Sequence, residues 1–185
     1  MIFKNAIFYF WSGTGNSYQS ACWLAEQAEK KGVTAEVLAL EQAAAMQKTA
    51  DSADRLMGLV FPTHGFTAPW QVLKLVWRLP RGRAGRAFCV TTRAGLKFGP
   101  LLIPGISGSA PFIVSLLLFF KGYRVRGVVS VDMPSNWFSL HPIQSRNKQE
   151  AIILRARPRV MGFLERLLGG DSVWCTRNIF FEITW

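Results

Sequence analysis

The feature that most constrains this chain is an apolar run that ends in a hydroxyl-rich loop and is followed at once by a helical pattern. The run covers residues 6–11, and the loop consists of Ser12, Gly13, Thr14, Gly15, Asn16 and Ser17. A strand that turns directly into a helix leaves the N–H groups of the first helical turn unpaired, with a partial positive charge. The loop therefore predicts an anion-binding site in which hydroxyls donate and glycines let the backbone come close.

The composition of this loop separates it from two common nucleotide sites. It contains no lysine, unlike a nucleoside-triphosphate loop, and its glycines do not follow the G-x-G-x-x-G spacing of a dinucleotide site. A plain helix cap is the alternative interpretation. The position favours the anion site, because a doubly wound sheet places its phosphate site at the first strand-to-helix loop.

Strands and helices are expected to alternate along the rest of the chain. Apolar runs typical of strands cover residues 6–11, 33–40, 55–61, 87–92 and 123–131. Helical patterns cover residues 16–31, 41–48, 69–79, 112–120 and 144–168. Parallel neighbours need crossover connections, so this order predicts an α/β fold, a doubly wound five-stranded parallel sheet in a three-layer sandwich. Pro158 predicts a kink or break in the last helix.

One domain accounts for most of the chain. Its length fits a single domain, which we expect to cover residues 1–170. Residues 171–185 form a C-terminal extension of unknown role, either an added edge strand or a partner contact.

Two loops and a later run resemble the flavodoxin family, in particular a subgroup often fused to an iron–sulfur ferredoxin. That subgroup commonly has Phe-Ser-Gly-Thr-Gly-Asn-Ser at its phosphate loop, close to residues 11–17 here. Its Pro-x-x-Gly-x-x-x-Pro loop is similar to residues 62–69, and its Met-Pro-Ser-Asn run to residues 133–136. The resemblance covers roughly residues 3–168 and implies strand order 2-1-3-4-5 with FMN as the cofactor. The ferredoxin part is absent, because no C-x-x-C-x-x-C run is present.

The resemblance also implies which residues bind FMN. The loop at residues 12–17 would hold the phosphate, and the loops after the third and fourth strands would hold the ring. The residues carried over from these two loops are Thr63, His64, Gly65, Phe66, Thr92, Arg93, Ala94 and Gly95. For His64, ring contact and a local turn role both stay open. Trp137, after the fifth strand, either covers the ring or packs its own loop.

The chain departs from ordinary flavodoxins in its charge. Lys plus Arg number 22 and Asp plus Glu 11, giving a net charge of +11, and no Asp or Glu lies between Arg55 and Val131. Arg93 and Lys97 would place cations near the flavin and predict a less negative reduction potential. The basic stretch is either a solvated surface or a field that attracts an acidic redox partner protein, NAD(P)H or an anionic membrane. No nucleic-acid-binding motif accompanies it.

Residues 98–120 carry no charged side chain. Prolines and glycines leave only residues 112–120 as an uninterrupted helix, which is too short to cross a membrane. This helix is apolar on all sides, so we expect its outer side to contact a second copy of the chain or a membrane surface.

The remaining features assign a class of function. No pattern predicts catalytic residues or metal ligands, and Cys22, Cys89 and Cys175 are too far apart for a disulfide framework or a zinc site, which makes them buried, reduced thiols. The absence of an export signal predicts a cytoplasmic protein, with a peripheral position at the inner membrane face as a variant. We expect an FMN-binding redox protein that exchanges electrons with a protein or quinone, either a carrier or an NAD(P)H oxidoreductase. The alternative is a non-catalytic module that kept the fold with an unoccupied flavin site.

Overall fold

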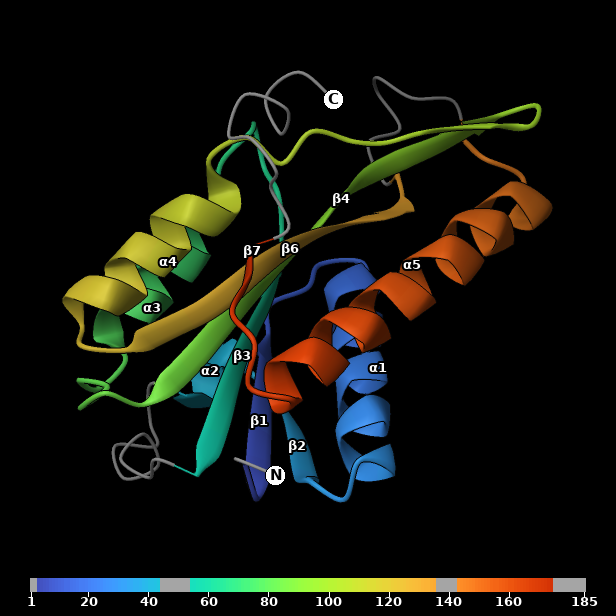
Figure 1. The fold of residues 1–185 in the computed structure, drawn as a ribbon. Coiled ribbons are helices and arrows are strands. Elements are labelled where there is room, and N and C mark those ends of the chain that lie inside the picture. The colour runs from blue at the N-terminus through green and yellow to red at the C-terminus, as the bar shows by residue number, and fades with distance from the viewer. Residues whose placement is uncertain (1–2, 44–53, 136–142, 175–185) are drawn as a thin grey trace.

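The computed structural model describes residues 3–43, 54–135 and 143–174. The elements in chain order are β1 (Asn5–Phe10), α1 (Asn16–Lys30), β2 (Thr34–Ala39), α2 (Leu40–Ala43), β3 (Arg55–Pro62), α3 (Trp70–Arg78), β4 (Arg86–Phe98), β5 (Leu101–Ile103), α4 (Ala110–Phe120), β6 (Arg124–Pro134), α5 (Arg146–Leu168) and β7 (Val173–Trp174). A parallel sheet lies between two helical layers, with α1 and α5 on one face and α3 and α4 on the other (Figure 1). The predicted parallel α/β sandwich is therefore confirmed.

The predicted number of strands is wrong. Within the described residues the sheet has seven strands, in the order β2-β1-β3-β4-β6-β7, with β5 paired to β4. Without β5 and β7, the remaining strands stand in the predicted 2-1-3-4-5 order. The short β5 arises because β4 turns back at Gly99, whose φ of 56° suits a tight turn, and pairs with it antiparallel. The two-residue β7 adds a parallel edge to β6, so the start of the C-terminal extension is an edge strand.

Strand β4 extends well beyond its predicted end at residue 92. Its last parallel pairing with β3 joins Thr92 to Pro62, and it then continues beside β6 through the pair Gly95 and Pro134. The residues expected to form a loop after this strand are therefore part of it. The partner strand β6, which also runs longer than predicted, supplies the hydrogen bonds that keep this segment extended.

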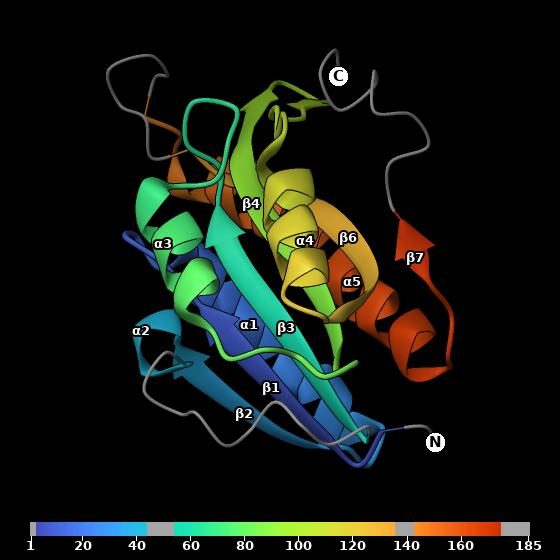
Figure 2. The ribbon, with the colours of Figure 1, turned by 90° about the vertical axis from the view of Figure 1, so that its left-hand side faces the viewer.

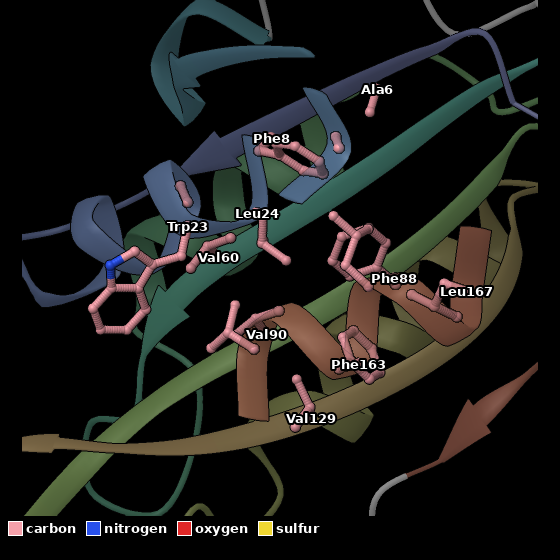
Figure 3. Packing of buried hydrophobic residues seen from close by; sticks show 14 of the residues in the cluster. Ala6, Phe8, Trp23, Leu24, Val60, Phe88, Val90, Val129, Phe163 and Leu167 are labelled. Carbon is pink, nitrogen blue, oxygen red and sulfur yellow. The ribbon is translucent and has the colours of Figure 1, made fainter. Parts of the chain in front are cut away.

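Both faces of the sheet are buried, as near-continuous apolar strands require. On the α1 and α5 side, Phe88 lies between Phe8 and Phe163, with ring centroids 6.0 and 5.5 Å away (Figure 3). On the α3 and α4 side, Val76 and Leu118 pack against the strands. Figure 2 looks onto this second layer.

Helix α5 differs from prediction, because it runs unbroken through Pro158. A proline at this position leaves the Leu154 carbonyl without its helical partner. Both residues lie on the exposed side of the helix, where that carbonyl can accept a hydrogen bond from solvent. Helix α2 is described from Leu40 to Ala43, and the rest of the helix expected at residues 41–48 lies outside the described residues, as does Trp137. Among the helices in the described ranges, none combines the length and apolarity needed to cross a membrane.

Candidate functional site

A cleft of about 450 Å³ opens where β1 and β3 end and where β4 and β6 continue past them. Its walls consist of Trp11, Ser12, Gly13, Thr14, Asn16, Ser17, Pro62, Thr63, His64, Gly65, Thr92, Arg93, Ala94, Pro134 and Ser135. Residues from all three segments chosen from the sequence thus meet in one place. This is the position at which open α/β sheets bind their ligands.

Three of the chosen residues do not line the cleft. Gly15 is the N-cap of α1, Phe66 is 59% exposed at the tip of a turn, and Gly95 borders a separate, smaller cavity against α5. Conversely, Trp11, Pro62, Pro134 and Ser135 line the cleft and were not chosen. Each of these residues lies at or next to the end of a strand. The predicted strand order indicated that the loop after the last long strand would form part of the site. It could not show which of its residues reach the cleft.

The N-terminus of α1 faces this cleft without a side-chain cap. The Ser12 hydroxyl accepts a hydrogen bond from the Gly15 N–H at 3.0 Å, and Gly15 has a φ of 91° that favours glycine. The N-cap residue of α1 makes no side-chain hydrogen bond to this helix end, and the first turn contains no acid. The helix end therefore offers a positive partial charge to an anion without a lysine.

Two long-range hydrogen bonds hold this helix end in place. The buried hydroxyls of Ser17 and Thr92 lie 3.1 Å apart, and the Asn16 side-chain amide donates to the Pro134 carbonyl at 3.0 Å. The Ser17 hydroxyl, expected to donate to a phosphate, is thus engaged with β4. Both contacts fix α1 against the strands that form the opposite wall.

The turn after β3 has an unusual backbone. The N–H groups of His64 and Thr67 each donate to the other residue's carbonyl, at 2.8 and 2.9 Å. Gly65 and Phe66 both have positive φ, 52° and 63°, which defines a type I′ turn. A bulky residue rarely adopts this conformation. The Phe66 carbonyl accepts a hydrogen bond from the Ser109 N–H at 2.8 Å, which holds the turn against the segment before α4.

His64 and Thr63 present side chains at the cleft wall. The His64 ring packs edge-on against Trp11, with centroids 6.0 Å apart, so His64 both forms the turn and lines the cleft. The Thr63 Oγ1 atom is buried and has no hydrogen-bond partner among the residues described. A buried hydroxyl without a partner costs free energy, and a bound ligand is one way to satisfy it.

Arg93 is not a free cation. Its side chain is almost fully buried, and its Nε donates to the Asp132 carboxylate at 2.8 Å, across the register of β4 and β6. The Gly105 N–H donates to the same carboxylate oxygen at 2.8 Å. Lys97 does not line the cleft. Of the two cations expected near the flavin, Arg93 thus lines the cleft and Lys97 does not, and the Asp132 carboxylate offsets the charge of Arg93.

The described ranges contain no cluster of His, Cys, Asp and Glu that could hold a metal ion. Burial raises the pKa of the Cys89 thiol to about 12, which keeps it protonated and unreactive at neutral pH. Cys22 is only half-buried, contrary to expectation, and Cys175 lies outside the described residues.

Comparison with known proteins places the fold. No family model matches this chain, and no curated protein matches it. A flavodoxin from Streptococcus pneumoniae TIGR4 has 16% identity and a TM-score of 0.59 over 90% of this chain and 99% of its own. Flavodoxin 1 from Bacillus cereus has 15% identity and a TM-score of 0.57, over 89% and 97%. A flavodoxin from the domain Archaea has 15% identity and a TM-score of 0.54, over 88% and 97%. The chain thus has the flavodoxin-like α/β fold that its loops predicted.

Proposed function

We propose that this chain is an FMN-binding redox protein that passes electrons to or from a protein or quinone partner. The observation that carries this proposal is the uncapped N-terminus of α1, which opens into the cleft beside the Ser12 and Thr14 residues. A phosphate monoester is an anion that accepts several hydrogen bonds, and the helix end and these hydroxyls supply donors for it.

The rest of the cleft suits the flat ring of a flavin. Its volume falls in the range of small-molecule sites. Trp11, Pro62, Ala94 and Pro134 offer apolar surface, and the unpaired Thr63 hydroxyl offers one polar contact to a ring heteroatom. When bound there, FMN would supply the electron-transfer chemistry, while the chain binds it, orients it and limits the access of water.

The charge of the chain bears on the electron partner. The segment from Arg55 to Val131 contains basic residues but no Asp or Glu, which supports an acidic redox protein or the phosphates of NAD(P)H as the partner. The first would make the chain a carrier, and the second an NAD(P)H oxidoreductase.

A second candidate function is a non-catalytic module whose flavin site is unused. The bond between Ser17 and Thr92 supports it, because this pair satisfies a hydroxyl of the phosphate loop without any ligand.

The test is the visible spectrum of the purified protein after incubation with FMN and removal of the excess. We expect the parent to retain flavin bands. Thr14→Val should weaken FMN binding on the order of tenfold or more, since it removes a hydroxyl beside a charged phosphate. Thr34→Val, an exposed threonine of β2 away from the cleft, is the matched control and should bind like the parent.

Riboflavin, which lacks the phosphate, separates the two parts of the site. Thr14→Val should leave riboflavin affinity unchanged. A parent that stays colourless with both ligands would contradict the proposal and favour the module.

A further inference from the structure

The outer side of α3 and α4 is apolar to an unusual degree. The two helices bury their other sides against the same face of the sheet, through Val76 of α3 and Val114 of α4 among others, so their exposed sides point the same way (Figure 2). On α4 the exposed residues are Leu116, Phe119 and Phe120, at 53, 64 and 70% exposure. None of these side chains can form a hydrogen bond.

Helix α3 adds an alternation of tryptophans and cations. Trp70, Lys74, Trp77 and Arg78 follow one another at helical spacing and are all exposed, the two tryptophans by 71 and 67%. Tryptophan and basic side chains on one helix face are typical of segments that lie at a membrane interface.

The two helices meet at a cationic end. The Lys121 ammonium at the end of α4 donates to the Trp77 carbonyl at 2.8 Å and lies 6.0 Å from the centre of the Trp77 ring. Burial lowers the pKa of Lys121, and the positive charge of Arg81 lowers it further. This end of the two helices therefore carries positive charge that is partly withdrawn from water, and an anion nearby would stabilise it.

No carboxylate on these elements balances the cations. Neither helix nor the segment that joins them contains Asp or Glu, because none occurs between Arg55 and Val131. Across the part of the chain that the structure describes, Lys74, Arg78 and Arg81 form no ion pair. Whatever covers this face must therefore be apolar in one part and anionic in another.

We propose that this outer side of α3 and α4, which we call the aromatic–basic face, docks on an anionic lipid bilayer. Leu116, Phe119 and Phe120 would enter the acyl boundary, while Lys74 and Arg78 would contact the phosphates of the headgroups. Trp70 and Trp77 would lie between these two levels, where tryptophan is enriched.

A second copy of the chain fits this face less well. A two-fold contact places the same patch of both copies together, so Lys74 and Arg78 would face a patch that carries the same cations and no acid. A protein partner would find no hydrogen-bonding side chain on the exposed stripe of α4, whereas protein interfaces carry about one hydrogen bond per 100–200 Å². A bilayer needs none there.

Docking would leave the cleft accessible. None of the residues that line the cleft lies on α3 or α4. The proposal is therefore independent of flavin binding, and either one can fail without the other.

The first test is cosedimentation with vesicles of phosphatidylcholine alone or mixed with phosphatidylglycerol. We expect the full chain to bind the mixed vesicles, and binding to weaken as salt rises. Phe119→Ser with Phe120→Ser should lower the partition coefficient at least tenfold. The matched control is Leu154→Ser, because Leu154 is 73% exposed but lies on α5, on the other side of the sheet, and this change should have little effect.

The second test separates a specific face from general positive charge. Lys74→Gln with Arg78→Gln should lower binding on the order of tenfold. Arg155→Gln with Arg159→Gln removes the same charge from α5 and should lower it far less.

Further outcomes decide the proposal. Absence of binding to mixed vesicles, or equal losses in both charge variants, would overturn it. A dimer in sedimentation velocity that the two serine substitutions dissociate would assign the face to a second copy instead. Retained binding in a variant with Trp70→Phe and Trp77→Phe, together with a loss of the tryptophan quenching that lipids brominated on their acyl chains cause in the parent, would support it.

Discussion

The two helical layers of this chain share one sheet but differ in what their outer sides carry. Outside α1 and α5, Glu26 pairs with Lys30 and Arg157, each at 2.7 Å, and Glu165 of α5 pairs with Lys31 after α1. On the outer side of α3 and α4, tryptophan and phenylalanine side chains are exposed to solvent, together with cations that form no ion pair within the described residues. The inner sides of both layers are buried. The fold therefore depends on the inner sides, whereas the composition of each outer side depends on what that side contacts.

The largest difference in stability is expected between two phenylalanine substitutions, one on a buried inner side and one on an exposed outer side. Phe88→Ala removes a fully buried ring between Phe8 and Phe163 and should destabilise the chain by about 3–5 kcal/mol. Phe119→Ala on the outer side of α4 should change stability by less than about 0.5 kcal/mol. Urea unfolding of the two variants measures both values. A large loss for Phe119→Ala would show that the outer side of α4 also supports the fold.

A smaller effect tests how dry the inner side of α3 and α4 is. Burial raises the pKa of Cys89 to about 12 from an ordinary value of 9.0, so above pH 9 the unfolded chain loses this proton and the folded chain keeps it. Stability should therefore fall as pH rises from about 9 to 12, by about 1.4 kcal/mol per pH unit. Cys89→Ala should flatten this slope, measured by urea unfolding, and Cys22→Ala should not. Equal slopes in all three proteins would mean that water reaches Cys89.

The smallest effect concerns the ion pairs outside α1 and α5. Hydrogen bonds from Lys30 and Arg157 lower the pKa of Glu26, so this carboxylate stabilises the fold above its ordinary pKa. Glu26→Gln should destabilise the chain slightly at neutral pH, and the difference should vanish as pH falls through the folded pKa or as salt rises. Glu29→Gln on the same helix, which breaks no ion pair, is the control. If the two variants have the same melting temperature at low salt, the ion pairs of Glu26 do not contribute to stability.

Local sequence patterns predicted those parts of the structure that are determined by residues close together in the chain. The strand, hydroxyl loop and helix at residues 6–30 lie within a residue or so of their predicted limits. The lack of acids between Arg55 and Val131 likewise indicated either a solvated basic surface or a positive field that attracts an anionic partner.

Contacts between distant residues could not be predicted in this way. Arg93 to Gly95 were expected to form a loop, and they are extended because β6 pairs with them in the register that joins Arg93 to Asp132. The bond between Ser17 and Thr92 joins residues 75 positions apart. The residues next to Arg93 or Ser17 in the sequence do not indicate that either side chain bonds to a distant strand. The charge of Arg93 and the hydroxyl of Ser17 were therefore assigned to a ligand.

The turn at Phe66 connects the cleft to α4. The N–H and hydroxyl of Ser109, the N-cap residue of α4, both donate to the Phe66 carbonyl, at 2.8 and 3.3 Å. A side chain at position 108 would lie 2.2 Å from that carbonyl, so only glycine lets the two segments come this close. The turn and the start of α4 are therefore held together at this point, so a side chain introduced at position 108 would displace the wall of the cleft that carries His64.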